Sequence, residues 1–345
     1  MKTKIAIVTL SLLVLVAIAL FVFMGVNRAP TGDTTTLQQV PHSFSQRFCV
    51  NGPGNGTVTD FALKNGINCF RTDIFLSSNE ISSISNGTKK GAQYLGILDY
   101  NTVGAQPSGN GCVSGCNWTL ADWNASVANA IRDYPDVNEW EIYNEPLASI
   151  FISGYDNGSA LNYFNMIKGA YTIIKSKEPN STVVCFGGAM MYPVQSAAAD
   201  YQFYKAVWQY GASRYCDAIS LHAYSLPYYD LNQSVYGNVT LGQLYNYTLF
   251  MYENMTGKPI WITETGITSN NWVQGLNMSQ QKQASFLMQD FGLFASHPYV
   301  KRVYWFNLQG PASGNTPDYG LLNAGTLQPK PAFGAFLYFS RNSLS

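Results

Sequence analysis

From residue 44 onward, short apolar runs rich in β-branched and aromatic residues alternate with longer segments of helical length. This alternation is typical of βα units arranged around a parallel sheet. Eight runs can be counted, which predicts an α/β fold of the (β/α)8 TIM-barrel type. The expected strands lie near Ser43–Val50, Cys69–Phe75, Tyr94–Asp99, Trp140–Asn144, Val183–Gly188, Ala218–Tyr224, Ile260–Glu264 and Arg302–Phe306, and amphipathic helices are expected at Asn162–Lys177, Ala199–Tyr210, Leu241–Met255 and Ser279–Ser296.

Length and charge limit the function classes. The chain has 345 residues, of which 46% are hydrophobic, so it can bury one large core, and we expect a single catalytic domain over residues 42–345 that acts as a monomer. Its 20 basic and 20 acidic residues cancel, which gives no electrostatic reason to bind nucleic acid and predicts an uncharged ligand. Three scattered histidines and the absence of a phosphate-binding glycine motif predict no metal and no cofactor.

The N-terminus carries a targeting signal. Lys2 and Lys4 precede Ile5–Val26, an apolar segment of 22 residues that is long enough to span a bilayer. This length favours an uncleaved transmembrane anchor, residues 1–26, over a cleaved signal peptide. The basic residues predict that the short N-terminus stays inside, so that the rest of the chain, secreted or anchored, lies outside the cytoplasm. Residues 27–41 are expected to form a polar linker.

Modification sites agree with an extracytoplasmic location. Six cysteines fit an oxidising compartment, and Cys112 and Cys116 are close enough to close a small loop. The other four, Cys49, Cys69, Cys185 and Cys216, can pair in three ways or remain thiols. Eleven glycosylation sequons predict a glycoprotein surface, at Asn55, Asn86, Asn117, Asn124, Asn157, Asn180, Asn232, Asn238, Asn246, Asn254 and Asn277.

Two glutamates end the fourth and seventh expected strands. The fourth run leads into Asn144-Glu145-Pro146, where the proline should bias Glu145 toward extended backbone, and the seventh leads into Thr263-Glu264-Thr265. Strand tips four and seven face each other across a barrel mouth. Two carboxylates about 5 to 5.5 Å apart are suited to double displacement at a sugar's anomeric carbon, in which one protonates the leaving oxygen and the other attacks. We expect the second carboxylate and partial desolvation to keep Glu145 protonated.

At these residues the chain resembles the clan A retaining glycoside hydrolases, which include families 5 and 39. The resemblance covers about residues 60 to 335, and it implies that Glu145 is the acid/base and Glu264 the nucleophile. It also implies that Asn144 binds a sugar hydroxyl. The segment Gly66–Asp73 is similar to the second strand of the clan, which implies that Arg71 binds the nucleophile and keeps it ionised. Glu141, on the same face of its strand as Glu145, is interpreted as a structural partner of Arg71.

Three further residues match the clan's substrate-binding positions. Leu221-His222-Ala223-Tyr224 resembles its sixth strand, which implies that Tyr224 donates a hydrogen bond to Glu264 and that His222 lines the sugar subsite. Trp305, at the end of the eighth strand, is similar to the clan's sugar-stacking tryptophan. One departure is Asp99-Tyr100-Asn101, where family 5 enzymes usually have a histidine, and this argues against family 5 itself.

The resulting hypothesis is a retaining hydrolase of β-linked neutral saccharides, resembling endo-β-glucanases or mannanases, with an acidic pH optimum. Two alternatives remain open. The chain could be a surface carbohydrate-binding protein without turnover, or a transglycosylase in which a sugar replaces water as acceptor. Open loops rich in aromatic and amide residues, such as Tyr224–Asn232 and Asn270–Gln274, are compatible with a groove for a polymer or a pocket for chain ends.

Overall fold

The computed structural model describes residues 47–52, 56–103, 119–147, 157–189, 194–272, 277–311, 316–323 and 325–342. The chain divides into two compact units, residues 1–39 and 40–345, and every described residue belongs to the second unit. The expected anchor, the polar linker and the Cys112–Cys116 loop lie outside the described residues. Among those that are described, no helix has the combination of length and apolar character needed to cross a bilayer.

Eight parallel strands close into a barrel, as predicted. Neighbouring strands are also neighbours in the chain, because each strand is followed by a helix that returns over the outside of the barrel. All eight expected strands are confirmed, with boundaries shifted by a few residues at most ends. In barrel order they are β1 (Phe48–Asn51), β2 (Cys69–Asp73), β3 (Gln93–Leu98), β4 (Glu139–Ile142), β5 (Thr182–Ala189), β6 (Ala218–Tyr224), β9 (Ile260–Gly266) and β10 (Val300–Trp305).

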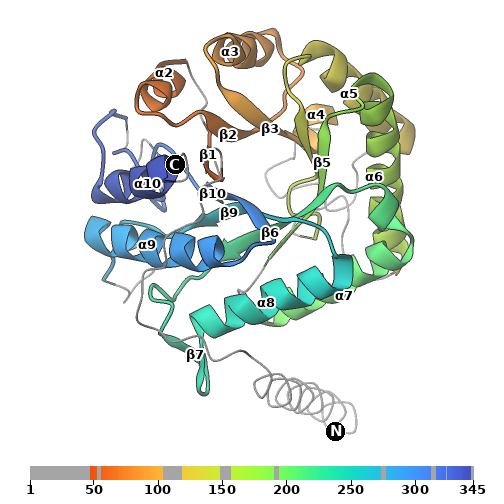
Figure 1. Ribbon diagram of the computed structural model, residues 1–345. Helices are drawn as coiled ribbons and strands as arrows, with labels where there is room; N and C mark the ends of the chain where they lie inside the picture. The colour runs from red at the N-terminus through yellow and green to blue at the C-terminus, as the bar shows by residue number, and fades with distance from the viewer. Residues whose placement is uncertain are drawn as a thin grey trace, which may run out of the picture. The chain divides into compact units, whose positions relative to one another are not determined.

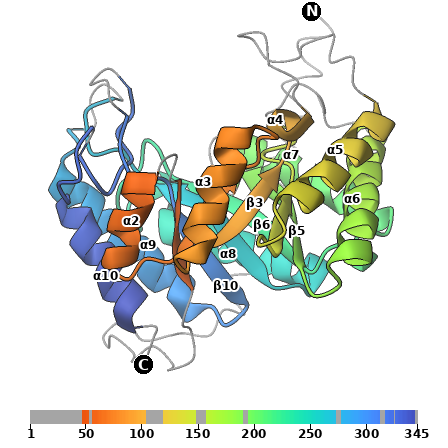
Figure 2. The ribbon, with the colours of Figure 1, turned by 90° about the horizontal axis from the view of Figure 1, so that it is seen from above.

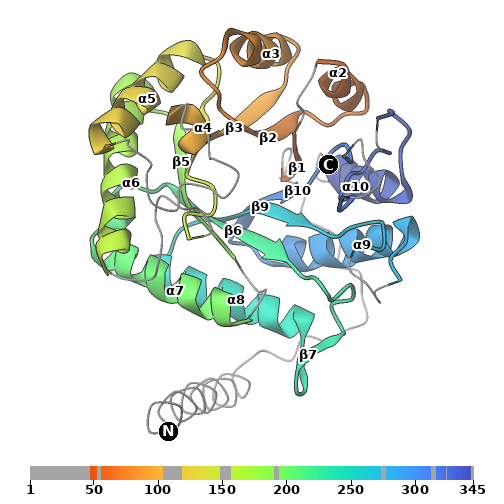
Figure 3. The same cartoon turned by 180° about the vertical axis from the view of Figure 1, so that it is seen from behind.

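Helices surround the barrel on all sides, as the views from the two ends show (Figure 1, Figure 3). The four expected helices are confirmed as α6, α7, α8 and α9. Several begin with a side chain that caps the first turn; for example, Thr240 and Gln243 form a capping box at the start of α8. The described helices are α2 (Gly56–Lys64), α3 (Ser78–Lys89), α4 (Tyr100–Val103), α5 (Leu120–Asp133), α6 (Asn157–Lys177), α7 (Val194–Gln209), α8 (Leu241–Thr256), α9 (Gln280–Ser296) and α10 (Pro331–Asn342).

Alternate residues along the strands build two cores. One large apolar cluster fills the space between strands and helices, where Figure 2 shows α3 lying alongside β3. A smaller cluster that includes Leu95, Val184, Trp261 and Tyr304 packs inside the barrel. Polar groups, among them the buried Arg71, also occupy inward positions on the strands. The barrel interior is therefore a packed core that supports polar side chains from below.

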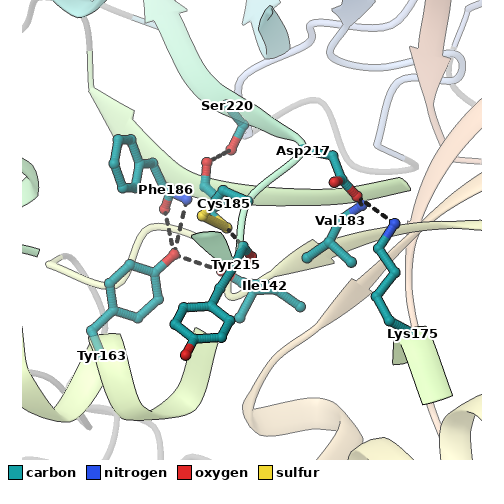
Figure 4. The surroundings of a disulfide bond; sticks show 10 residues. Ile142, Tyr163, Lys175, Val183, Cys185, Phe186, Tyr215, Asp217 and Ser220 are labelled. Carbon is teal, nitrogen blue, oxygen red and sulfur yellow. Dashed lines mark hydrogen bonds and ion pairs between the residues drawn. A yellow bond between two sulfur atoms is a disulfide. The ribbon is translucent and has the colours of Figure 1, made fainter. Parts of the chain in front are cut away.

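Two disulfide bonds settle the pairing of four cysteines. Cys49–Cys69 joins β1 to β2, and Cys185–Cys216 joins β5 to the segment before β6, with Cα–Cα distances of 5.0 and 5.8 Å. The first bond thus cross-links two neighbouring strands, and the second ties β5 to the segment that leads into its neighbour β6. Figure 4 shows the surroundings of the second bond, including the hydrogen bond from the Ser220 hydroxyl to the carbonyl of Cys185 (3.3 Å). Disulfides of this kind persist in oxidising compartments.

The surface carries most of the described sequons. Seven of the sequon asparagines are exposed and are therefore accessible to a glycosyltransferase, namely Asn86, Asn180, Asn232, Asn238, Asn246, Asn254 and Asn277. Asn124 is half-buried on α5, where its side chain lies against Gly169 of α6, so it is the least suited of the described sequons. A short hairpin, β7 (Ser234–Tyr236) and β8 (Val239–Thr240), follows β6 and was not predicted.

Candidate active site

The backbone turns sharply just beyond β4. Tyr143 and Glu145 adopt left-handed φ angles of 71° and 44°, so the expectation of extended backbone at Glu145 is wrong. Tertiary contacts override the local preference imposed by the following proline. The Tyr163 hydroxyl of α6 donates to the carbonyl of Ile142 (2.7 Å) and accepts from the amide of Phe186 (2.9 Å), which ties the end of β4 to β5 (Figure 4).

A glycine makes this turn possible. Gly187 has φ of +76°, and a Cβ atom there would lie 3.1 Å from the amide nitrogen of Glu145 and 3.3 Å from the carbonyl oxygen of Tyr143. Strand β5 also changes register with β6 between Phe186 and Gly188. The irregular strand and its glycine therefore make room for the left-handed residues that carry the Glu145 carboxylate.

Arg71 of β2 is the centre of the buried hydrogen-bond network. Its guanidinium donates to Glu264 Oε1 (2.6 Å), Glu141 Oε2 (2.5 Å), Asn51 Oδ1 (2.9 Å) and Asn144 Oδ1 (2.7 Å). Burial alone would lower the pKa of Arg71, but the charges of Glu141 and Glu264 outweigh it and raise the pKa above its usual value. Arg71 therefore stays charged and fixes three strand ends relative to one another.

The two expected contacts of Glu264 are both present. Arg71 occupies Oε1, and the Tyr224 hydroxyl donates to Oε2 at 2.5 Å. The Glu264 side chain is only 10% exposed. A carboxylate that accepts hydrogen bonds from a guanidinium and a phenol in a buried position is fixed in orientation. A nucleophile that attacks one carbon atom requires such a fixed orientation.

His222 lies between the two glutamates. Its Nδ1 atom is 2.8 Å from Glu145 Oε1 and 3.8 Å from Glu264 Oε2. Burial opposes a charge on His222, but the two carboxylates raise its pKa above 6.5. Burial alone would raise the pKa of Glu145. The hydrogen bond and charge of His222, together with the charge of Arg71, outweigh burial and lower this pKa below its usual value. The expectation that the surroundings keep Glu145 protonated in the free protein is therefore wrong in direction.

The carboxylates of Glu145 and Glu264 lie within reach of one sugar. An oxygen of each and a ring nitrogen of His222 all lie within 4.8 Å of one another. This spacing is close to the roughly 5 Å typical of retaining glycosidases and well short of the inverting range. The same three atoms are placed so that they could hold a metal ion, and no other such group occurs in the described ranges. Because Arg71 and Tyr224 already occupy both oxygens of Glu264, a metal-free site stays our prediction.

Asn144 is oriented by Arg71. The guanidinium holds its Oδ1 atom, so the amide NH2 group is left as a donor, as a contact to a sugar hydroxyl would require. The interpretation of Glu141 as a partner of Arg71 agrees with their hydrogen bond. Glu141 is fully buried and also accepts from the Thr263 hydroxyl (2.9 Å), so it has no access to a substrate.

Trp305 is not at the barrel mouth. Its side chain is fully buried, packs edge-on against Phe291 of α9 and donates to the carbonyl of Tyr319 (2.9 Å), which rules out the expected stacking on a sugar in this structure. The next residue, Phe306, is partly exposed and contacts the rings of Tyr224 and Tyr319, with centroid distances of 6.2 and 5.6 Å. Sequence reasoning missed Phe306 and Tyr319, although both stand in segments that resemble the clan.

The fold and these side chains define a (β/α)8 barrel with a pair of carboxylates at its carboxyl end. Residues 199–332 match the family model described as glycosyl hydrolase catalytic core. The predicted resemblance to glycoside hydrolases is therefore confirmed. Comparison with curated proteins gave no match.

Solved structures of glycoside hydrolases share the fold. A family 39 glycoside hydrolase from Bacteroides cellulosilyticus WH2 is 21% identical, with a TM-score of 0.63 over 88% of this chain and 66% of that chain. A β-D-glucuronidase from Dictyoglomus thermophilum is 14% identical, with a TM-score of 0.58 over 87% of this chain and 51% of that chain. A Bacteroides uniformis β-glucuronidase is 13% identical, with a TM-score of 0.60 over 87% of this chain and 35% of that chain. This chain thus spans between about a third and two thirds of the length of these proteins.

Proposed function

We propose that this protein is a retaining glycoside hydrolase that cleaves β-glycosidic bonds by double displacement. The observation that carries the proposal is the pair Glu145 and Glu264, with oxygens within 4.8 Å, of which Glu264 is held in place by hydrogen bonds from Arg71 and Tyr224. Two carboxylates in this arrangement can supply the acid and the nucleophile of the reaction.

In the first step, Glu264 attacks the anomeric carbon while protonated Glu145 gives its proton to the departing oxygen. The bond to the leaving sugar breaks as an ester bond to Glu264 forms. In the second step, Glu145 removes a proton from water, the water oxygen attacks the same carbon, and Glu264 leaves as a carboxylate. Asn144, held by Arg71, is placed to bind a hydroxyl of the reacting sugar.

The pKa directions bear on the working pH. Because His222 and Arg71 outweigh burial and lower the pKa of Glu145, the protonated acid is populated in the free enzyme at acidic pH. The proposal therefore includes an acidic optimum. It also includes a location outside the cytoplasm, which the two disulfides and the exposed sequons support. Anchoring through residues 5–26, and a β-glucan or mannan as substrate, remain proposals from sequence.

Covalent trapping tests the proposal. A panel of 2-fluoro sugars should form an ester on Glu264, detected by mass spectrometry of the digested protein. Glu264→Ala should abolish labelling and turnover, and Glu145→Ala should slow turnover by at least about 100-fold. Glu253→Ala, on the outer helix α8, is the matched control and should change neither. Labelling of a different residue, or turnover that survives Glu264→Ala, would refute the assignment; a carbohydrate-binding protein would show no turnover at all.

A further inference from the structure

The carboxyl end of the barrel is almost free of basic residues. Eight connections lead from a strand to the next surrounding helix, and the functional side chains of such barrels stand on these connections and on the strand tips. Seven of the eight contain no lysine, arginine or histidine, and the eighth contains Lys330 alone. The connections are residues 52–55, 74–77, 99–119, 143–156, 190–193, 225–240, 267–279 and 306–330.

The nearby cations are already occupied. Lys330 is only 2% exposed, and its Nζ atom contacts Asp318 Oδ1 (2.6 Å) and the Ser269 hydroxyl (3.1 Å). Lys282, in the first turn of α9, donates to the carbonyl of Asn277 (2.8 Å) and lies 4.6 Å from the ring centroid of Tyr229. Both lysines therefore stabilise loops of the protein and are engaged before any ligand arrives.

The two cations of the site are engaged as well. Arg71 donates to two carboxylates and two amide oxygens, and His222 contacts Glu145 and lies near Glu264. An anionic sugar would have to displace one of these buried ion pairs to gain a partner. Breaking such a pair leaves an uncompensated buried charge, which is strongly unfavourable.

A further carboxylate stands beside the site. Asp73 is the last residue of β2, two positions after Arg71, so the two side chains share a face of the strand. Burial and the charges of Glu264 and Glu141 outweigh the charge of Arg71 and raise the pKa of Asp73, and no hydrogen bond to it occurs within the described part of the chain. Asp73 is only partly buried. Its oxygens are thus available to accept hydrogen bonds from sugar hydroxyls.

We propose that this site selects uncharged sugars and excludes uronic acids, with Asp73 as the specificity-determining residue. The proposal rests on the proposed glycosidase function and narrows its substrate. A carboxylate accepts hydrogen bonds from hydroxyl groups of a neutral sugar, but it repels the carboxylate of a uronic acid. Several solved structures that share the fold are β-glucuronidases by name. This chain combines the same type of barrel with strand-to-helix connections in which the single basic residue, Lys330, is buried and paired with Asp318.

A matched pair of probes tests the inference. Cyclophellitol-6-carboxylate aziridine, which binds covalently to a Bacteroides uniformis β-glucuronidase, differs from the neutral cyclophellitol aziridine in the group at C6. We would measure the labelling rate of Glu264 with both, in gluco, galacto and manno configurations. The expected result is that a neutral probe labels Glu264 at least about 100-fold faster than its carboxylate counterpart.

Variants separate charge repulsion from shape. Asp73→Asn should reduce this preference by about tenfold, because it removes the negative charge and nearly keeps the size. Asp136→Asn, exposed and outside the eight connections, is the control and should leave the preference unchanged. A carboxylate probe that labels Glu264 as fast as the neutral one overturns the inference and leaves the proposed function standing. No labelling of Glu264 by any probe overturns both.

Discussion

The contact between His222 and Glu145 predicts a measurable change in the pH profile. His222→Asn removes a charged donor 2.8 Å from Glu145. A hydrogen bond to an ionised group contributes about 1.5–3 kcal/mol. The Glu145 side chain is 37% exposed, so screening by solvent should reduce this to about half, or about 1 kcal/mol. That free energy corresponds to a rise of a little under one unit in the pKa of Glu145.

The assay is kcat/KM as a function of pH on the best neutral substrate. Protonated Glu145 is the general acid, so its pKa in the free enzyme sets the alkaline side of the profile. We therefore expect His222→Asn to move the alkaline limb upward by about one pH unit while lowering the maximum. Tyr224→Phe is the matched control: it removes the donor to Glu264 and should lower kcat without moving the alkaline limb. A limb that stays in place or moves downward in His222→Asn would refute the proposed effect of His222 on Glu145.

Two further predictions concern a loop and the core. Trp272 is 51% exposed on the connection after β9 and should bind a sugar unit distant from the cleaved bond. Trp272→Ala should therefore reduce kcat/KM about tenfold on polymers and leave kcat/KM on short substrates unchanged. Phe250→Ala, at an exposed residue of the outer helix α8, is the control and should change neither value. Burial raises the pKa of Asp290 to about 8, despite its hydrogen bond from Thr265. Because the pKa of Asp290 is higher in the folded state than in the unfolded state, the free energy of unfolding should fall by about 1 kcal/mol per pH unit as the pH rises from about 4 to about 8. Urea unfolding at a series of pH values should show a smaller fall in this free energy for Asp290→Asn.

The alternation of strands and helices in the sequence was sufficient to place the barrel and its two glutamates. Strand tips four and seven converge because a closed barrel leaves each strand a fixed place. The pairing of Cys49 with Cys69 could not be read from spacing, although it follows once β1 and β2 are known to be neighbours. The β7–β8 hairpin is too short and too exposed to leave a periodic signal.

The two errors have different causes. The expectation for Trp305 came from the resemblance to the clan and did not follow the alternation along β10, in which Tyr304 belongs to the inner cluster and Trp305 packs outward against α9. The ring that contacts Tyr224 is that of Phe306. At Glu145, local preference predicted extended backbone, yet Gly187 of the neighbouring strand allows a left-handed turn. Gly187 is far from Glu145 in the sequence, so the residues around Glu145 could not indicate this turn.

The two glutamates of the site contact different kinds of cation. Glu264 accepts a hydrogen bond from Arg71, a group that does not lose its proton, so this contact persists at every working pH. Glu145 is instead hydrogen-bonded to His222, which can itself lose its proton. The charges of both carboxylates raise the pKa of His222. Replacing His222 therefore changes the pH dependence, whereas replacing Arg71 removes the contact that orients Glu264. The two carboxylates thus differ in whether the cation to which each is hydrogen-bonded can titrate.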